Sequence, residues 1–254
     1  MIETARASYF LMMRSLRESI RQPAVEAANI FIPIFFFAVT VGAVGNVAAR
    51  AFGVSNYLAF QMPVAILQAV AGTSGSAGLG TVQDIERGYF DKLLLTPAPR
   101  VALVLGRLGA DAVRAMFLTL LIVGGGFAVG SGMASGPVGF VALIALAGLF
   151  GLGYSGIGMA IALRTGSAQA AQAGFLVFFP LLFLSPAFAP KEVFAGWLEF
   201  LATINPVTYV LQGMRSLIID GWDLGSIAAM LAAIAGIAVF TLTLTMMALR
   251  SRVT

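Results

Sequence analysis

Long apolar runs without any charged residue dominate this chain and limit what it can fold into. These runs cover residues 27–49, 51–83, 115–163, 165–190 and 224–249. A transmembrane helix needs about 20 consecutive apolar residues, so every run is long enough to cross a bilayer. The chain is 59% hydrophobic and only 10% charged, whereas soluble proteins carry about 25% charged residues. Both features predict an integral membrane protein with several crossings.

The run at residues 115–163 is too long for one crossing. A turn signal rich in Gly and Ser, from Gly130 to Pro137, divides it into two. The sequence therefore predicts an all-α integral membrane fold, with six transmembrane helices in one domain that covers residues 1–254. We expect these helices at about residues 28–47, 57–79, 108–129, 138–163, 165–190 and 224–249.

The basic residues are distributed unevenly between the two sides of such a six-span arrangement. One side would hold Arg6, Arg14, Arg17, Arg21, Arg87, Lys92, Arg100, Arg107, Arg164, Arg250 and Arg252. The other side would hold only Arg50, Lys191 and Arg215. Because Lys and Arg concentrate on the cytoplasmic side, we expect a multi-pass protein of the cell membrane with both termini in the cytoplasm. The same bias accounts for the pI of about 9.9 without a nucleic-acid partner.

Two amphipathic segments lie outside the predicted spans. In residues 1–22, Arg6, Arg14, Arg17 and Arg21 share one arc of a helix, and Tyr9, Met12, Met13, Leu16 and Ile20 share another. This pattern favours a helix in the membrane interface, although a helix packed on protein has the same signature. Residues 186–225 are too polar to span and too apolar for a solvated loop. They predict a pair of partly re-entrant helices on the outer face, at residues 191–203 and 206–219, separated at Asn205-Pro206.

The stretch at residues 81–99 holds the densest charge in the chain and lies between two apolar runs. A charged segment between two spans must stay on one side of the membrane. We interpret it as a short helix on the cytoplasmic surface, with a mixed charged and leucine-rich face that fits a groove on a soluble partner.

Arg107, Asp111 and Arg114 share one face of the third predicted span. Charges in a membrane helix need partners or water, and Asp111 can pair with either arginine. One interpretation is a self-neutralised cluster at the cytoplasmic end of the span. The alternative is a gate through which a substrate enters.

Aromatic residues crowd at two places, and Phe36, Phe175 and Phe179 are candidates for a substrate path. Packing against lipid or against the protein core is the ordinary explanation for such residues, and a cavity for apolar substrates is the alternative. Pro180, Pro186 and Pro190 are expected to break the end of the fifth span. Broken helices at membrane depth must be buried in protein or line a cavity.

The sequence offers no catalytic or metal-binding constellation. It contains no Cys and no His, which removes thiolate ligands and the commonest general base. The string Gly151-Leu-Gly-Tyr-Ser-Gly156 has the residue pattern of a dinucleotide-binding fingerprint, but it lies inside an apolar span. Close packing of helices explains its small residues better. The Gly-rich segment at residues 72–81 lacks the lysine of a phosphate-binding loop. We therefore expect no catalytic site, cofactor or metal in this chain.

The segment Glu86-Arg-Gly-Tyr-Phe-Asp-Lys-Leu-Leu-Leu-Thr-Pro-Ala-Pro-Arg100 closely resembles the cytoplasmic segment of type-2 ABC (ABC-2) exporter permeases. Asn205-Pro-Val-Thr-Tyr209, Met214-Arg215 and Asp220-Gly221 resemble the segment before that family's last span. The layout of six spans agrees, so the resemblance covers essentially the whole chain. The most similar members are permeases of the antibiotic- and daunorubicin-resistance kind.

The resemblance implies a transmembrane subunit of an ATP-driven exporter that moves a hydrophobic or amphipathic substrate, such as a drug or lipid. The central segment would be the coupling helix that binds a separate ATPase subunit. The positions that match the family's motif are Glu86, Arg87, Gly88, Asp91, Leu94, Thr96 and Pro97. Two ATPase copies would bind ATP and Mg, and a second permease, identical or a paralogue, would complete the complex among membrane lipids.

Other classes fit the sequence less well. A membrane-embedded enzyme would show clustered His, Asp or Cys residues at interfacial depth, which are not seen. A secondary transporter would favour inverted repeats and carboxylates at the midplane, but the spans after Arg114 have none. A non-transporting membrane scaffold in an ABC-like regulatory complex remains the alternative.

Overall fold

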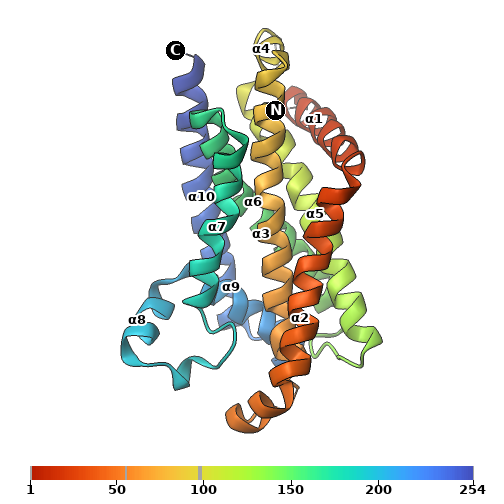
Figure 1. The fold of residues 1–254 in the computed structure, drawn as a ribbon, viewed down its shortest axis with the longest axis vertical. Helices are drawn as coiled ribbons and strands as arrows, with labels where there is room; N and C mark the ends of the chain where they lie inside the picture. Colours follow the sequence, from red (N-terminus) through yellow and green to blue (C-terminus); the bar gives the residue numbers. More distant parts are fainter. Residues whose placement is uncertain (1, 55, 97–98, 254) are drawn as a thin grey trace.

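The computed structural model describes residues 2–54, 56–96 and 99–253, and no strand occurs among them (Figure 1). The long helices are α2 (Pro23–Phe52), α3 (Tyr57–Glu86), α5 (Arg100–Ala128), α6 (Gly136–Thr165), α7 (Ala168–Phe183) and α10 (Leu224–Val253). The shorter ones are α1 (Ile2–Ile20), α4 (Tyr89–Leu94), α8 (Gly196–Ile204) and α9 (Pro206–Arg215), with a 3-10 turn at Lys191–Val193 and a π-helical turn at Ser216–Asp220. A helix therefore occupies each place where the sequence predicts a span.

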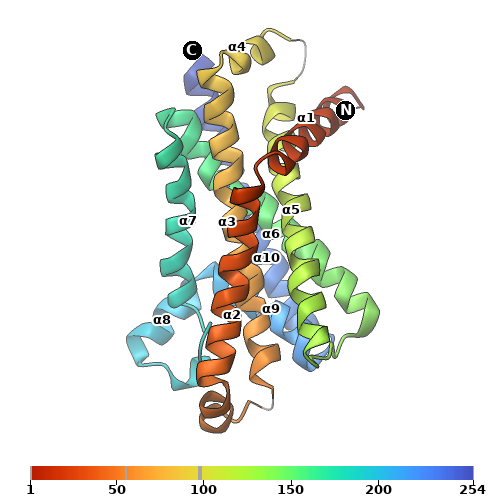
Figure 2. The same ribbon diagram turned by 45° about the vertical axis from the view of Figure 1, so that its right-hand side comes forward.

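The long helices form a bundle, and helix α3 lies at its centre. Helices α2, α5, α6 and α7 all pack against α3, and α10 packs against the far side of α6. Figures 1 and 2 show α1, α4 and the last turns of α10 at one end of the bundle. Helix α8 and the α5–α6 connection lie at the opposite end. We call these the α4 end and the α8 end.

Hydropathy and length mark four of the described helices, α2, α5, α6 and α10, as able to cross a membrane. Helix α3 falls outside this set because its apolar stretch is interrupted by polar side chains such as Gln61, Thr73 and Ser74. These side chains are buried against neighbouring helices, so they do not meet the surroundings of the bundle. Helix α7 has only 16 residues, about 24 Å, which is shorter than the apolar thickness of a bilayer.

Small residues allow the central helices to approach closely. The Cα of Gly78 on α3 faces Gly158 on α6 so closely that an added Cβ would lie 2.6 Å from the Gly158 carbonyl oxygen. Gly153 and Gly156 of the dinucleotide-like string face α10, where the hydroxyl of Thr241 donates to the Gly153 carbonyl at 2.6 Å. The string is therefore a helix-packing motif.

Helix α1 packs along α5 through one of its faces. Leu11 lies against Gly106. Met12, a member of the predicted apolar arc, lies against Gly109, so protein covers part of that arc. Tyr9 and Ile20 of that arc remain exposed. Helix α1 thus has one face on protein and another that is open, and its predicted position in the membrane interface stays a prediction.

The segment before α10 forms two helices, as predicted, but with different bounds. The first begins at Gly196 rather than at residue 191, because residues 191–193 form a separate 3-10 turn after Pro190. Asn205 ends α8 and caps α9, since its side-chain oxygen accepts from the Val207 amide at 3.0 Å. Helix α9 is buried in the core, whereas α8 exposes Trp197 and Phe200.

Candidate functional site

Helix α4 leaves the bundle at a sharp turn after α3. Gly88 adopts φ +65°, a left-handed conformation that favours glycine, and an added Cβ there would meet no atom within 4 Å. The backbone conformation rather than space therefore requires glycine at this position. The hydroxyl of Thr96 closes the other end of α4 by donating to the Leu93 carbonyl at 2.6 Å.

One side of α4 is anchored in the bundle. Phe90 is only 3% exposed and belongs to a cluster with Val104 and Leu108 of α5 and Met159 of α6. Leu94 packs against the same cluster. The family resemblance placed Leu94 among the residues that contact a partner, but its side chain is turned largely toward the bundle.

The other side of α4 and its flanking residues are open. The exposed residues of the predicted coupling set are Glu86, Arg87, Asp91 and Thr96, and Leu95 beside them is 88% exposed. Pro97, the last member of that set, lies outside the described residues. The arrangement is a charged surface supported from behind by a phenylalanine.

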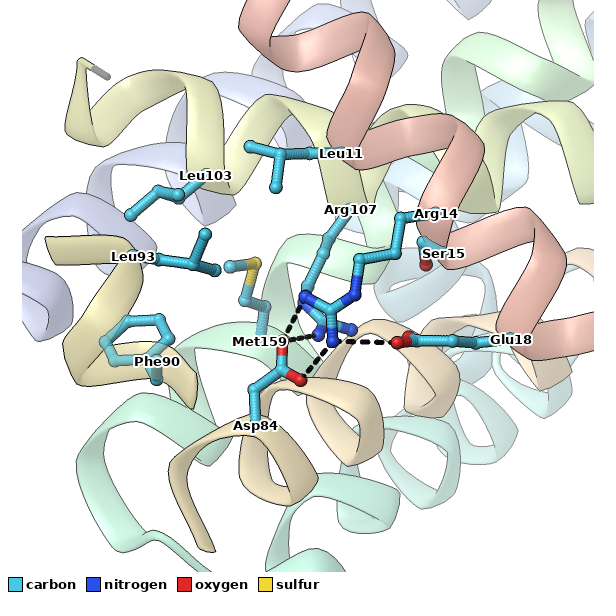
Figure 3. Close-up of a pocket in the computed structure, with 10 residues that line it drawn as sticks. All are labelled: Leu11, Arg14, Ser15, Glu18, Asp84, Phe90, Leu93, Leu103, Arg107 and Met159. Carbon is cyan, nitrogen blue, oxygen red and sulfur yellow. Dashed lines mark hydrogen bonds and ion pairs between the residues drawn. The ribbon is translucent and has the colours of Figure 1, made fainter. Parts of the chain in front are cut away.

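Asp84 connects three helices directly beneath α4 (Figure 3). Its carboxylate on α3 accepts hydrogen bonds from Arg14 of α1, at 2.6 Å and 3.2 Å, and from Arg107 of α5. Arg14 also pairs with Glu18 at 2.8 Å, and its guanidinium lies 3.9 Å from the centre of the Tyr89 ring, the first residue of α4. We call Arg14, Asp84 and Arg107 the Asp84 cluster.

A glycine makes room for this cluster. Gly80 lies one helical turn before Asp84, and an added Cβ there would collide with Nη1 of Arg107. In the sequence, Asp84 is the first charge after a long uncharged run, which is a signal for a buried partner that the predicted site residues leave out. The sequence could not identify Arg14 and Arg107 as partners, since they are 70 and 23 residues away along the chain.

The candidate gate residues Arg107, Asp111 and Arg114 divide between two sets of direct ion pairs. Arg107 turns to Asp84, whereas Asp111 pairs with Arg114. Arg114 also lies 3.4 Å from Glu26 of α2. The second group, Glu26, Asp111 and Arg114, therefore connects α5 to α2.

The three phenylalanines suggested for a substrate path line one groove. Phe36 of α2 and Phe175 and Phe179 of α7 form part of a groove of about 600 Å³ between these helices, with α3 at its base. Its polar members carry no charge: Asn29, Gln68, Ser76, Gln169 and Gln172. The side-chain nitrogen of Asn29 is buried and has no hydrogen-bond partner in the described part of the chain. The groove can therefore hold an apolar molecule that carries neutral hydrogen-bonding groups.

Comparison with known families adds the decisive observation. The model of the ABC-2 type transporter family matches residues 6–219. This chain belongs to that family. A similar protein is the daunorubicin resistance ABC transporter permease protein DrrB1 of Streptomyces coeruleorubidus, 26% identical over 82% of this chain and 74% of that protein. Another is the probable doxorubicin resistance ABC transporter permease protein DrrC of Mycobacterium tuberculosis, 25% identical over 83% of this chain and 76% of that protein.

An ABC-2 protein of this kind is a membrane-embedded permease subunit of an ABC exporter, and its family implies an ABC ATPase partner. The matched region contains both the α4 surface and the groove. It also contains Asp84 and its two arginines. The candidate site of this ABC-2 permease thus consists of a charged surface at one end of the bundle, an ionic cluster beneath it and an uncharged groove along α3.

Proposed function

We propose that this permease exports a hydrophobic or amphipathic molecule by alternating access, driven by two copies of an ATPase that bind ATP and Mg. The observation that carries the proposal is the construction of α4. Its outer side is exposed and charged, and its inner side inserts Phe90 between α3, α5 and α6. A force applied to the outer side is therefore transmitted to three core helices.

The Asp84 cluster provides a second connection. When α4 moves, Tyr89 moves relative to Arg14, and Arg14 holds α1 to the carboxylate of α3. Ion pairs between side chains on different helices can break and re-form without disturbing a backbone hydrogen bond. The bundle would then have two arrangements that differ in affinity for the ATPase. The nucleotide bound to the ATPase would decide which arrangement is populated.

The groove on α2, α3 and α7 is our candidate for the substrate path. Its phenyl rings suit an aromatic or aliphatic body, and its amides suit neutral polar substituents. Only 6% of the apolar stretch of α2 is buried within this chain, which leaves a wide apolar surface beside the groove. A second permease, identical or a paralogue, would cover this surface and close the path between the two subunits.

We further propose six crossings, with α3 and α7 added to the four helices marked by hydropathy. Helix α3 is surrounded by α2, α5, α6 and α7, so its polar side chains do not need to face lipid. With six crossings, the arginine-rich α4 end lies in the cytoplasm, where the positive-inside rule predicts it. This orientation gives the ATPase access to α4.

The test is vesicle transport by the permease reconstituted with its co-purifying ATPase. Daunorubicin, the drug in the name of the relative DrrB1, is the fluorescent probe. We expect ATP-dependent accumulation with the wild type and at least a tenfold loss with Glu86→Gln or Gly88→Ala, while the ATPase still hydrolyses ATP. The permease alone is expected to hydrolyse no ATP.

Arg50→Gln is the matched control, because Arg50 is also an exposed charge but lies at the far end of α2, away from α4. It is expected to transport normally. Normal transport by both α4 variants would contradict the coupling role, and ATP hydrolysis by the permease alone would contradict the division into two subunits. Nucleotide-driven movement of α4 without transport of any tested amphiphile would favour the scaffold alternative.

A further inference from the structure

The exposed face of α1 carries arginines that the coupling mechanism does not use. A surface groove of about 500 Å³ runs along this face and is lined by Tyr9, Phe10, Met13, Arg14, Arg17 and Arg21, together with the carboxylate of Glu18. Glu18 is already paired with Arg14 at 2.8 Å. Within the described residues, Arg17 and Arg21 form no ion pair, so two guanidinium groups are available to an anion.

We propose that this groove binds the phosphate headgroup of an anionic phospholipid. Tyr9 and Phe10 are 52% and 60% exposed, and they lie on the same open face as Arg17 and Arg21. A face that mixes arginines with exposed aromatic rings matches the boundary between headgroups and acyl chains. A purely soluble anion would need the arginines but not the rings.

The position of α1 restricts the choice of ligand further. Only Arg21 and Gln22 separate the end of α1 from the first residue of α2, one of the four helices that can cross a membrane. Two residues extend the chain by at most about 7 Å. Arg17 and Arg21, in the last turn of α1 and just after it, are therefore held at the level of the headgroups.

The lipid site adjoins the coupling machinery. Arg14 lines both the surface groove and the small pocket that contains Asp84 and Phe90 (Figure 3). Its guanidinium is already fixed by Asp84 and Glu18. Arg14 thus forms the fixed wall of the site, and Arg17 and Arg21 supply the groups that are free to bind phosphate.

The orientation under the proposed function decides only which leaflet of the membrane supplies the lipid. Lipid binding itself can be measured without ATP or a partner. The purified full-length chain in detergent is titrated with dioleoylphosphatidylglycerol, with dioleoylphosphatidylcholine and with inorganic phosphate, and bound lipid is counted by native mass spectrometry. We expect preferential binding of phosphatidylglycerol. Each arginine near an anionic surface changes affinity about fivefold, so the double variant Arg17→Gln/Arg21→Gln is expected to bind about 25-fold more weakly.

Two matched variants separate charge from folding. Arg17→Lys/Arg21→Lys keeps the charge and is expected to retain binding, and Arg50→Gln removes an exposed arginine at the other end of α2 without effect. Both positions of the double Gln variant are exposed, so its melting temperature is expected to match that of the wild type.

Three results would overturn the proposal. Equal binding of phosphatidylglycerol by the wild type and the double Gln variant would show that Arg17 and Arg21 do not bind the lipid headgroup. Displacement of the lipid by millimolar inorganic phosphate would identify a free anion as the ligand. Unchanged lipid binding combined with loss of the co-purifying ATPase would assign this face to a protein partner. Failure of daunorubicin transport would leave the lipid measurement unaffected.

Discussion

Two arginines are buried at opposite ends of the bundle, and the structure satisfies them in different ways. At the α4 end, Arg107 of α5 pairs with the side chain of Asp84 on α3. At the α8 end, Arg215 of α9 donates to three backbone carbonyl oxygens: Phe60 at 3.0 Å, Pro186 at 2.6 Å and Ala187 at 2.9 Å. The Arg215 guanidinium also lies 3.5 Å from the centre of the Phe60 ring.

The difference concerns what must move to break each contact. An ion pair between two side chains separates when either side chain rotates, without movement of the backbone, although a buried pair then needs a replacement partner for each charge. The Arg215 contacts end on backbone, so they hold α3, α9 and the segment after α7 in one geometry. We therefore expect the contacts at the α4 end to exchange partners more readily than those at the α8 end.

The largest expected effect comes from removing the shared carboxylate. Asp84→Asn leaves two arginines facing a neutral amide, and breaking a buried pair in this way costs about 3–5 kcal/mol. Thermal unfolding in detergent measures the loss. Asp91→Asn, an exposed carboxylate on α4, serves as the control and is expected to change stability by less than about 0.5 kcal/mol. Equal stability of the two variants would show that the Asp84 cluster does not hold the helices together.

A smaller loss of stability is expected when lysine replaces Arg215 or Arg107, and its size depends on how many acceptors each arginine contacts. Arg215→Lys keeps the charge but provides one nitrogen for three carbonyls, so we expect a loss of about 2–3 kcal/mol from unpaired carbonyls. Arg107→Lys keeps a point charge beside a carboxylate and is expected to lose less than half as much. Melting curves of the two variants, measured side by side, make the comparison. A larger loss for Arg107→Lys would reverse our assignment of the fixed and exchangeable ends.

The smallest effect concerns Gly80, whose missing side chain lets Arg107 reach Asp84. Alanine stabilises a helix relative to glycine by about 1 kcal/mol, but at residue 80 the new methyl group displaces the guanidinium. We expect Gly80→Ala to gain none of this stability. Gly42→Ala is the control, because an added Cβ there meets no atom within 4 Å. An equal gain at both positions, measured by thermal unfolding, would show that Arg107 adapts without loss.

The sequence predicted those features of the fold that depend on residues close together along the chain. Charge-free length located all six long helices, and the Gly-rich turn at residues 130–137 correctly divided α5 from α6. Asn205-Pro206 marked the boundary between α8 and α9. The candidate residues Phe36, Phe175 and Phe179 share a groove, which the sequence offered only as the alternative to packing against lipid or the protein core. Hydropathy and length mark only four of the described helices. The polar side chains of α3 are explained only by the helices that pack around it.

Helix periodicity left open which partner each charged residue takes. Spacing along α5 allowed Asp111 to pair with Arg107 or Arg114. It pairs with Arg114, whereas Arg107 pairs across to Asp84 of α3. Periodicity along α1 placed Arg14 in a basic outer face, although its guanidinium turns inward to Asp84. In both cases the arginine contacts a buried carboxylate on another helix, and Arg14 keeps a second pair with Glu18 on its own helix.

The sequence by itself determined that this protein enters a membrane as a bundle of apolar helices with most of its arginines at one end. Those properties follow from transfer energies and helix geometry, which act over a few turns of chain. Only the tertiary structure decided which carboxylate receives which arginine, and that the polar helix α3 lies at the centre. Both depend on how closely helices distant in sequence approach each other, which the glycines permit but do not specify.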